Sequence, residues 1–155
     1  MDAGSIILPK YVFRGTSYGF AGNQASILRP CTHTTRNPAK AALFAMRCRL
    51  SFDAQPVIYI ADTAKLNHLP LIDPNVLSHI EEEYNWEIRP IEFCKYCEGY
   101  IELEDLKNVL KQINVNIAGS VTLHNLSERC EQVSVMDNGS IDKLYLQIQK
   151  FLKTN

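Results

Sequence analysis

A seven-residue run, PVIYIAD at positions 56–62, constrains the fold more than any other part of the sequence. Four consecutive large apolar residues, from Val57 to Ile60, occupy its centre. A strand with one face in water alternates apolar and polar residues, whereas a strand covered on both faces is apolar throughout. The run therefore predicts a central strand and not a half-exposed edge strand.

The clearest helix signal of the sequence precedes the run. Asn37 suits the N-cap, Pro38 suits the first helical position, and the strong helix formers AKAALFAMRCR follow. Apolar residues spaced three or four apart predict one buried stripe, formed by Ala41, Phe44, Ala45 and Cys48.

Strand-like and helix-like patterns alternate along the rest of the chain. They predict an extended entry at 5–14, a helix at 75–84, a strand at 85–93 interrupted at a proline, a helix at 102–113 and a short strand at 120–126. A glycine turn at 138–139 then leads into a last helix. This order of elements predicts an α+β fold.

Length and charge narrow the classes of protein further. The 155 residues fit a single domain, 1–155, in which 114–155 is a C-terminal extension of uncertain role. Sixteen Lys and Arg against 17 Asp and Glu give a net charge of −1, so we expect no nucleic-acid partner. No run of 18 apolar residues occurs, so we also expect no membrane span.

The N-terminal residues and the number of cysteines indicate the cellular compartment of the protein. The first residues lack the basic start and cleavage site of a secretory signal. Five cysteines are an odd number in a chain that is too large to depend on disulfides. We expect a cytoplasmic protein, or one translocated into a host cell without a cleavable signal peptide.

Residues suited to anion chemistry gather in the segment 11–45. A strand-like stretch ends at Arg14, a glycine-rich stretch begins at Gly15, and the hydroxyl-rich segment THTT occupies 32–35. The planar fork of an arginine makes two parallel hydrogen bonds to a phosphate, and glycines let backbone N–H groups approach the same anion. On spacing alone, a surface arginine before an ordinary loop is the simpler explanation.

Several motifs nevertheless occur here in a characteristic order, namely Phe13-Arg14-Gly15-Thr16, then His33-Thr34-Thr35, then Pro38, Ala41 and Phe44-Ala45. In this order they resemble the mono-ADP-ribosyltransferases of the arginine–serine–glutamate type, a family that includes many bacterial toxins and effectors. The resemblance covers about half of the chain, from residue 11 to 93. It implies a split β-sheet around an NAD cleft, with flanking helices.

The third element of that family is a glutamate, often within Glu-x-Glu, at the start of a later strand. Its best match is Glu81-Glu82-Glu83, which makes Glu83 the implied catalytic residue and Glu81 its upstream partner. The same cluster is also typical of a helix end in water, where charged runs usually lie. Glu87 and Glu92 are the alternative candidates for the catalytic position.

The resemblance implies an enzyme with NAD as its substrate. It would break the nicotinamide–ribose bond and transfer ADP-ribose to a side chain of a protein acceptor, such as a host protein. Glu83 would stabilise the positive charge that develops on the ribose, and Arg14 would hold the pyrophosphate. A hydroxyl of Thr34 or Thr35 would position the glutamate, because His33 stands where the family usually has its first serine. The remaining candidates for binding NAD are Gly15, Thr16 and Phe44.

Departures from the family pattern leave a second hypothesis open. The histidine at position 33 and the uncertain glutamate register are compatible with a lapsed active site on the same fold, which would then bind a protein or peptide. Tyr18 and Phe20 lie in the glycine-rich stretch, where a ring could stack on nicotinamide or adenine, and ordinary packing is the alternative.

Two cysteine patterns carry weaker signals. Cys94 and Cys97 form a CxxC, which could be half of a zinc site in a small adaptor, but a structural zinc needs two more ligands. Cys31 and His33 are separated by one residue, and the partners of a catalytic dyad usually meet only in the fold. Neither pattern outweighs the resemblance, which implies no metal.

Overall fold

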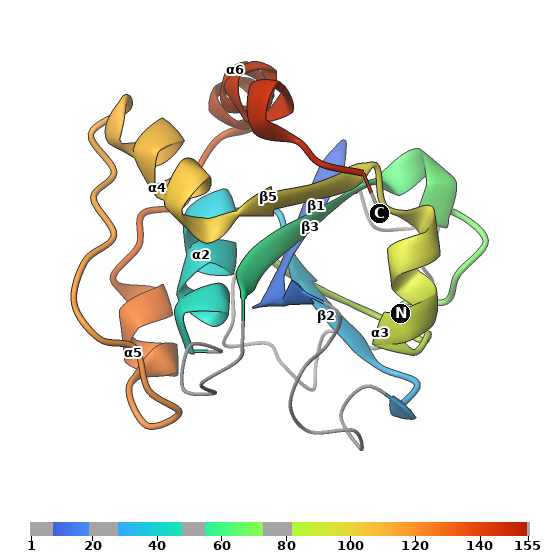
Figure 1. The fold of residues 1–155 in the computed structure, drawn as a ribbon. Coiled ribbons are helices and arrows are strands. Elements are labelled where there is room, and N and C mark those ends of the chain that lie inside the picture. Colours follow the sequence, from blue (N-terminus) through green and yellow to red (C-terminus); the bar gives the residue numbers. More distant parts are fainter. Residues whose placement is uncertain (1–7, 19–27, 48–54, 73–81, 155) are drawn as a thin grey trace.

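A five-stranded antiparallel sheet forms the centre of the molecule, with the strand order β4-β2-β1-β3-β5 (Figure 1). The structure is a computed structural model and describes residues 8–18, 28–47, 55–72 and 82–154. The strands are β1 (Tyr11–Ser17), β2 (Thr32–Thr35), β3 (Pro56–Asp62), β4 (Glu83–Trp86) and β5 (Gly99–Glu102). Because the apolar run 56–62 is β3 and has a neighbour on each side, the prediction of a central strand is confirmed.

Helices flank the sheet, so the α+β fold class is also confirmed. The helices are α2 (Pro38–Arg47), α3 (Pro90–Phe93), α4 (Leu103–Lys111), α5 (Leu126–Glu131) and α6 (Asn138–Ile148), and the 3-10 turns are η4 (Thr63–Leu66), η6 (Cys94–Tyr96) and η7 (Gln149–Phe151). Figure 1 shows α2, α4 and α5 grouped together, with α3 apart from them on the other side of the sheet. Within the described ranges, no helix has the length and apolar character needed to cross a membrane.

The two faces of the sheet pack into different apolar clusters. Phe13 and Ile58 belong to the largest cluster, together with buried residues of α2, α4 and α6. Val12 and Ala61 pack instead into a second cluster around the buried Trp86. Because successive residues of a strand point to opposite faces, these two clusters cover the sheet on both sides.

Helix α2 begins as the sequence predicts. Asn37 Oδ1 accepts a hydrogen bond from the N–H of Ala39 at 3.0 Å, so Asn37 is the N-cap, and Pro38 is the first helical residue. Ala41 and Ala45 of the predicted stripe are buried.

The close approach of α2 to β1 explains a glycine. A Cβ added to Gly15 would lie 1.9 Å from the carbonyl oxygen of Ala41 and 2.7 Å from the backbone nitrogen of Ala45. Gly15 is therefore a strand residue packed under a helix backbone, and not the start of a loop as expected. Gly19 and Gly22 lie outside the described residues.

The segment around β4 differs from the prediction. Of the predicted helix 75–84, positions up to 81 lie outside the described residues, while Glu83 and Tyr84 belong to a strand. The predicted strand 85–93 ends at Trp86, and α3 occupies 90–93. Pro90 accounts for this change, because its ring suits the first turn of a helix and supplies no N–H to a strand ladder.

The tail from residue 114 onward contributes to the main core. Its buried residues Ile141 and Ile148 belong to the largest apolar cluster. The predicted strand at 120–126 is wrong, because Thr122 and Asn125 form a local turn in which the N–H of Thr122 donates to Asn125 Oδ1 at 2.7 Å. Helix α5 begins directly after this turn, at Leu126.

The turn predicted at 138–139 is also wrong. Both residues lie in the first turn of α6. Asp137 caps this helix, since its Oδ1 accepts a hydrogen bond from the N–H of Ser140 at 2.8 Å. A good N-cap residue thus outweighs the turn preference of the Asn-Gly pair.

Candidate functional site

Strands β1 and β2 pair at a single position. Their one register pair is Phe13 with Thr35, whereas β1 and β3 are paired from Tyr11 to Ser17. Beyond this pair, β1 runs on from Phe13 to Arg14, and the antiparallel β2 runs from Thr35 back to Thr32. No further residues of the two strands are paired there. The two strands therefore part at Arg14, and we call this place the strand parting.

Arg14 bonds to the edge of β2 that the parting exposes. Its Nη1 donates a hydrogen bond to the carbonyl oxygen of His33 at 3.1 Å. The N–H of Arg36 donates to the Glu82 carbonyl at 3.0 Å, on the β4 side of β2. Because the peptide groups of a strand alternate between its two sides, the His33 carbonyl faces β1. The guanidinium thus occupies a position where a strand ladder would otherwise continue.

A histidine, an asparagine and a cysteine meet beside the parting. His33 and Asn85 lie opposite each other on β2 and β4, and His33 Nδ1 is hydrogen-bonded to Asn85 Oδ1. The other ring nitrogen, Nε2, lies 3.7 Å from Cys31 Sγ. Since an amide oxygen can only accept, Nδ1 carries the ring proton and Nε2 is left to accept from the thiol. Burial lowers the pKa of His33 and favours this neutral form.

Glu83 carries a buried carboxyl oxygen close to these residues. It is the first residue of β4 and lies opposite Thr35. Its Oε2 is buried and has no hydrogen-bond partner among the described residues. Burial raises the pKa of Glu83 to about 7, although Lys40 acts to lower it. A carboxyl group that titrates near neutral pH is typical of a functional site.

Electrostatic effects on Cys31 connect these groups. Burial raises the pKa of the Cys31 thiol, the charges of Arg29 and Arg14 lower it, and Glu83 raises it. The thiol therefore lies within electrostatic reach of both Arg14 and Glu83. By strand alternation Glu83 shares the face of His33 and Asn85, while Arg14 starts from the opposite face and reaches the parting.

The two threonines expected to position the glutamate have other hydrogen bonds. Thr34 Oγ1 donates to the Tyr84 carbonyl at 2.9 Å and accepts from Trp86 Nε1 at 2.9 Å. Thr35 Oγ1 accepts from the N–H of Asn37 at 3.1 Å. Both hydroxyls thus stabilise the sheet and the start of α2.

The other predicted site residues are less directly connected to the parting. Thr16 is buried in β1, while Phe44 packs against the largest apolar cluster and Gly15 against the α2 backbone. Glu87 is exposed, and Glu92 accepts a hydrogen bond from Arg89 Nε at 2.8 Å. Glu81 and Phe20 lie outside the described residues, and Tyr18 is 44% exposed.

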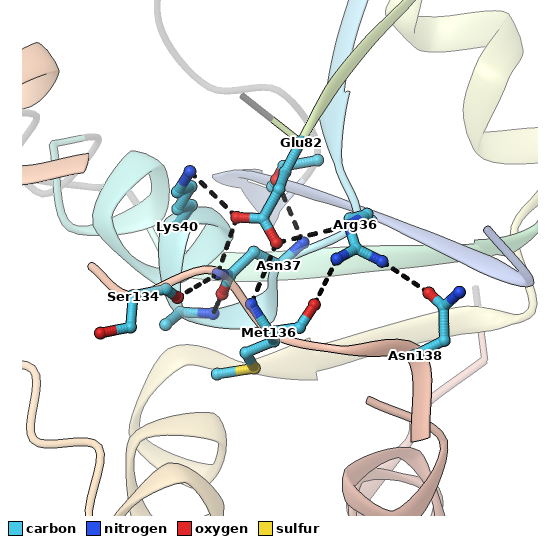
Figure 2. A network of polar contacts seen from close by, with 9 residues as sticks. Arg36, Asn37, Lys40, Glu82, Ser134, Met136 and Asn138 are labelled. Atoms are coloured by element: carbon cyan, nitrogen blue, oxygen red, sulfur yellow. Dashed lines mark hydrogen bonds and ion pairs between the residues drawn. The ribbon is translucent and has the colours of Figure 1, made fainter. Parts of the chain in front are cut away.

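Glu82, for which the sequence predicts no role, is the centre of a buried polar network (Figure 2). Its side chain is 2% exposed and forms ion pairs with Arg36 Nε at 3.3 Å and Lys40 Nζ at 3.0 Å. It also accepts hydrogen bonds from Asn37 Nδ2 at 3.0 Å and from the N–H of Met136 at 3.2 Å. The network joins the start of β4 to the start of α2 and to the tail, so it fixes the position of the neighbouring Glu83.

Both cysteines of the CxxC pair lie within the described residues. Cys94 is buried, and Cys97 Sγ donates a hydrogen bond to the Phe93 carbonyl oxygen at 3.6 Å. Among the described residues, no group of three or more His, Cys, Asp or Glu side chains could hold a metal ion. The zinc-adaptor hypothesis therefore has no support in this part of the chain.

Comparisons with known proteins give no assignment. No protein-family model matches the chain, and no curated protein or solved structure matches it significantly. Sequence reasoning missed Asn85 as well as Glu82, and the only signal for Asn85 is the β2–β4 register, which places it opposite His33.

Proposed function

We propose that this protein is a mono-ADP-ribosyltransferase that cleaves the nicotinamide–ribose bond of NAD and transfers ADP-ribose to a protein side chain. One observation carries the proposal. The strands that bear Arg14, the segment 32–35 and Glu83 are direct neighbours in the order β1, β2, β4, although they lie far apart in the sequence. Their adjacency, together with the parting at Arg14, supports the split-sheet architecture that the resemblance implies.

Arg14 is the residue suited to the anionic part of the substrate. Its guanidinium carries a positive charge, and Nη1 bonds to the His33 carbonyl at the parting. A planar fork of this kind binds the oxygens of a pyrophosphate with parallel, charge-assisted hydrogen bonds. Arg14 would therefore hold NAD at the parting of β1 and β2.

Glu83 is suited to the ribose from which nicotinamide leaves. When the C–N bond breaks, nicotinamide departs with the bonding electrons and positive charge develops on the ribose. A fixed carboxylate stabilises that charge more strongly in the transition state than in the ground state, which raises the rate. An acceptor side chain of the target protein then attacks the ribose carbon. Because the hydroxyls of Thr34 and Thr35 are bonded elsewhere, we assign neither a direct role.

Nicotinamide release from NAD by the purified protein tests this proposal. We expect Glu83→Gln and Arg14→Ala each to lose on the order of 10²–10³ in rate, the usual effect of removing one preorganised group. Glu104→Gln, at an exposed position on α4, is the matched control and should keep the wild-type rate.

Two results would separate the alternatives. Absence of both NAD binding and nicotinamide release, at high protein concentration, would overturn the proposal. NAD or peptide binding without release would instead favour the lapsed domain, a protein-binding module with the same fold.

A further inference from the structure

We propose that Cys31, His33 and Asn85 form a thiol-nucleophile site that accepts acyl groups from esters or thioesters carrying a negative charge. This activity goes beyond NAD chemistry and does not depend on it. The proposal rests on three side chains that the β2–β4 register brings together, although Asn85 lies more than fifty positions from the other two.

The hydrogen bonds are arranged as an activated thiol requires. Asn85 Oδ1 fixes the Nδ1 proton of His33, so Nε2 presents its lone pair to Cys31 Sγ at 3.7 Å. A nucleophile beside a base, with the base oriented by a third group, is the arrangement common to enzymes that form covalent intermediates. The order Cys, His, Asn is one of its known forms.

Access together with a neighbouring base distinguishes Cys31 from the other cysteines of the described residues. Cys31 and Cys97 are partly exposed, whereas Cys94 and Cys130 are buried, and the Cys97 thiol donates to a backbone carbonyl and not to a base. Cys31 therefore combines a path to solvent with a base at hydrogen-bond distance.

Nearby charge indicates the class of substrate. Of the charges that act on the Cys31 thiol, Arg14 and Arg29 favour its anionic form, whereas Glu83 opposes it. Arg14 is held at the site by its hydrogen bond to the His33 carbonyl at 3.1 Å. The same positive charges favour an acyl group that bears a carboxylate or a phosphate. The charges thus select an anionic ester or thioester over a neutral one.

The reaction balances as a hydrolysis in two steps. The thiol proton moves to His33 Nε2 while Sγ forms a bond to the acyl carbon, and the C–O or C–S bond of the substrate breaks as the leaving group takes that proton. Water then gives a proton to Nε2 and attacks the S-acyl carbon. The S–C bond breaks, Cys31 regains its proton, and a carboxylic acid is released.

The experiment uses 4-nitrophenyl hydrogen succinate as the charged probe and 4-nitrophenyl acetate as the neutral one. Peptide mapping by mass spectrometry should find the acyl group on Cys31, and Cys31→Ser should lose it. We expect His33→Ala to slow acylation on the order of 10²-fold or more, the usual contribution of a general base. His124→Ala and Asn116→Ala, at exposed positions, are the matched controls and should react at the wild-type rate.

A pH profile of the wild-type protein tests the same idea without a variant. If His33 is the base, the acylation rate rises with an inflection below 6.5, because burial lowers the pKa of His33. A thiol acting alone would inflect above 9.0, because burial raises the pKa of Cys31. An inflection above 9.0, or an unchanged rate in His33→Ala, would overturn the proposal. Arg14→Ala should reduce the preference for the charged probe.

Discussion

At the scale of single residues, the carboxyl group of Glu83 couples protonation to folding. Burial raises its pKa from 4.5 in the unfolded chain to about 7 in the folded protein. Between these two values the folded state therefore binds more protons than the unfolded state. By linkage, this group makes folding less favourable as the pH rises through that window.

We therefore expect Glu83→Gln to remove part of the pH dependence of stability. In the wild type, the Glu83 contribution to the free energy of unfolding falls as the pH rises from 4.5 to about 7. The glutamine of the variant cannot ionise. The free energy of unfolding of the variant minus that of the wild type should therefore increase as the pH rises through this range. Urea titrations at a series of pH values measure the difference. A difference that stays constant with pH would show that Glu83 does not titrate as its burial suggests.

At the scale of secondary-structure elements, Glu82 connects β4, α2 and the tail through one buried charge (Figure 2). Glu82 has a φ of 73°, an uncommon value for a residue with a side chain. Two ion pairs and two side-chain hydrogen bonds hold it in this conformation. Figure 2 shows the partners arriving from both sides of the carboxylate, so its loss would affect all three segments.

Removing the charge at Glu82 should strongly destabilise the protein. Glu82→Gln removes the buried carboxylate that pairs with Arg36 and Lys40, and breaking a buried pair costs about 3–5 kcal/mol. Glu87→Gln, at an exposed position on the same segment, should change the free energy of unfolding by less than about 0.5 kcal/mol. Urea denaturation of the two variants makes the comparison. Equal stabilities would mean that the network adds little to folding.

The contact between α2 and β1 leads to a second expectation at this scale. Gly15→Ala places a Cβ against the α2 backbone, which cannot move aside as a flexible side chain could. Overpacking of this kind costs about 1–3 kcal/mol, and we expect the upper end of that range. Gly139→Ala, in the first turn of α6, is the matched control, since its added Cβ would meet only the Asp137 side chain at 3.3 Å. Thermal unfolding should separate the two variants, and similar melting temperatures would contradict the close packing.

At the scale of the whole molecule, features determined by neighbouring residues can be predicted from the sequence, whereas the pairing of distant strands cannot. The cap at Asn37 and the apolar run 56–62 were predicted correctly, because neighbouring residues determine both. The pairing of His33 with Asn85 could not be predicted, because register depends on contacts between distant segments.

Long-range contacts also explain the errors among the charged residues. The cluster around Glu82 has the composition of a solvent-exposed helix end, and only the positions of Arg36, Lys40 and Met136 make its burial possible. Glu83 is the first residue of β4, whereas helix periodicity predicted a helix there.

The C-terminal tail contributes to the stability of the whole molecule. Ile141, Leu144 and Ile148 of α6 are buried in the main cluster, and each stabilises the fold by about 1.5–3 kcal/mol relative to exposure. The tail also supplies the Met136 N–H to Glu82. Domain stabilities are about 5–15 kcal/mol, so the loss of these contacts removes a large part of the total.

We therefore expect a chain that lacks residues 134–155 to lose its cooperative unfolding transition. A chain that lacks only the last two residues is the control and should unfold like the full chain, because the paired Lys153 is retained. Circular dichroism during heating and limited proteolysis measure both. A cooperative transition in the shorter chain would mean that residues 8–133 fold without the tail, and that α6 covers a core that is already formed. Limited proteolysis of the full chain would then leave a stable fragment that ends near residue 133.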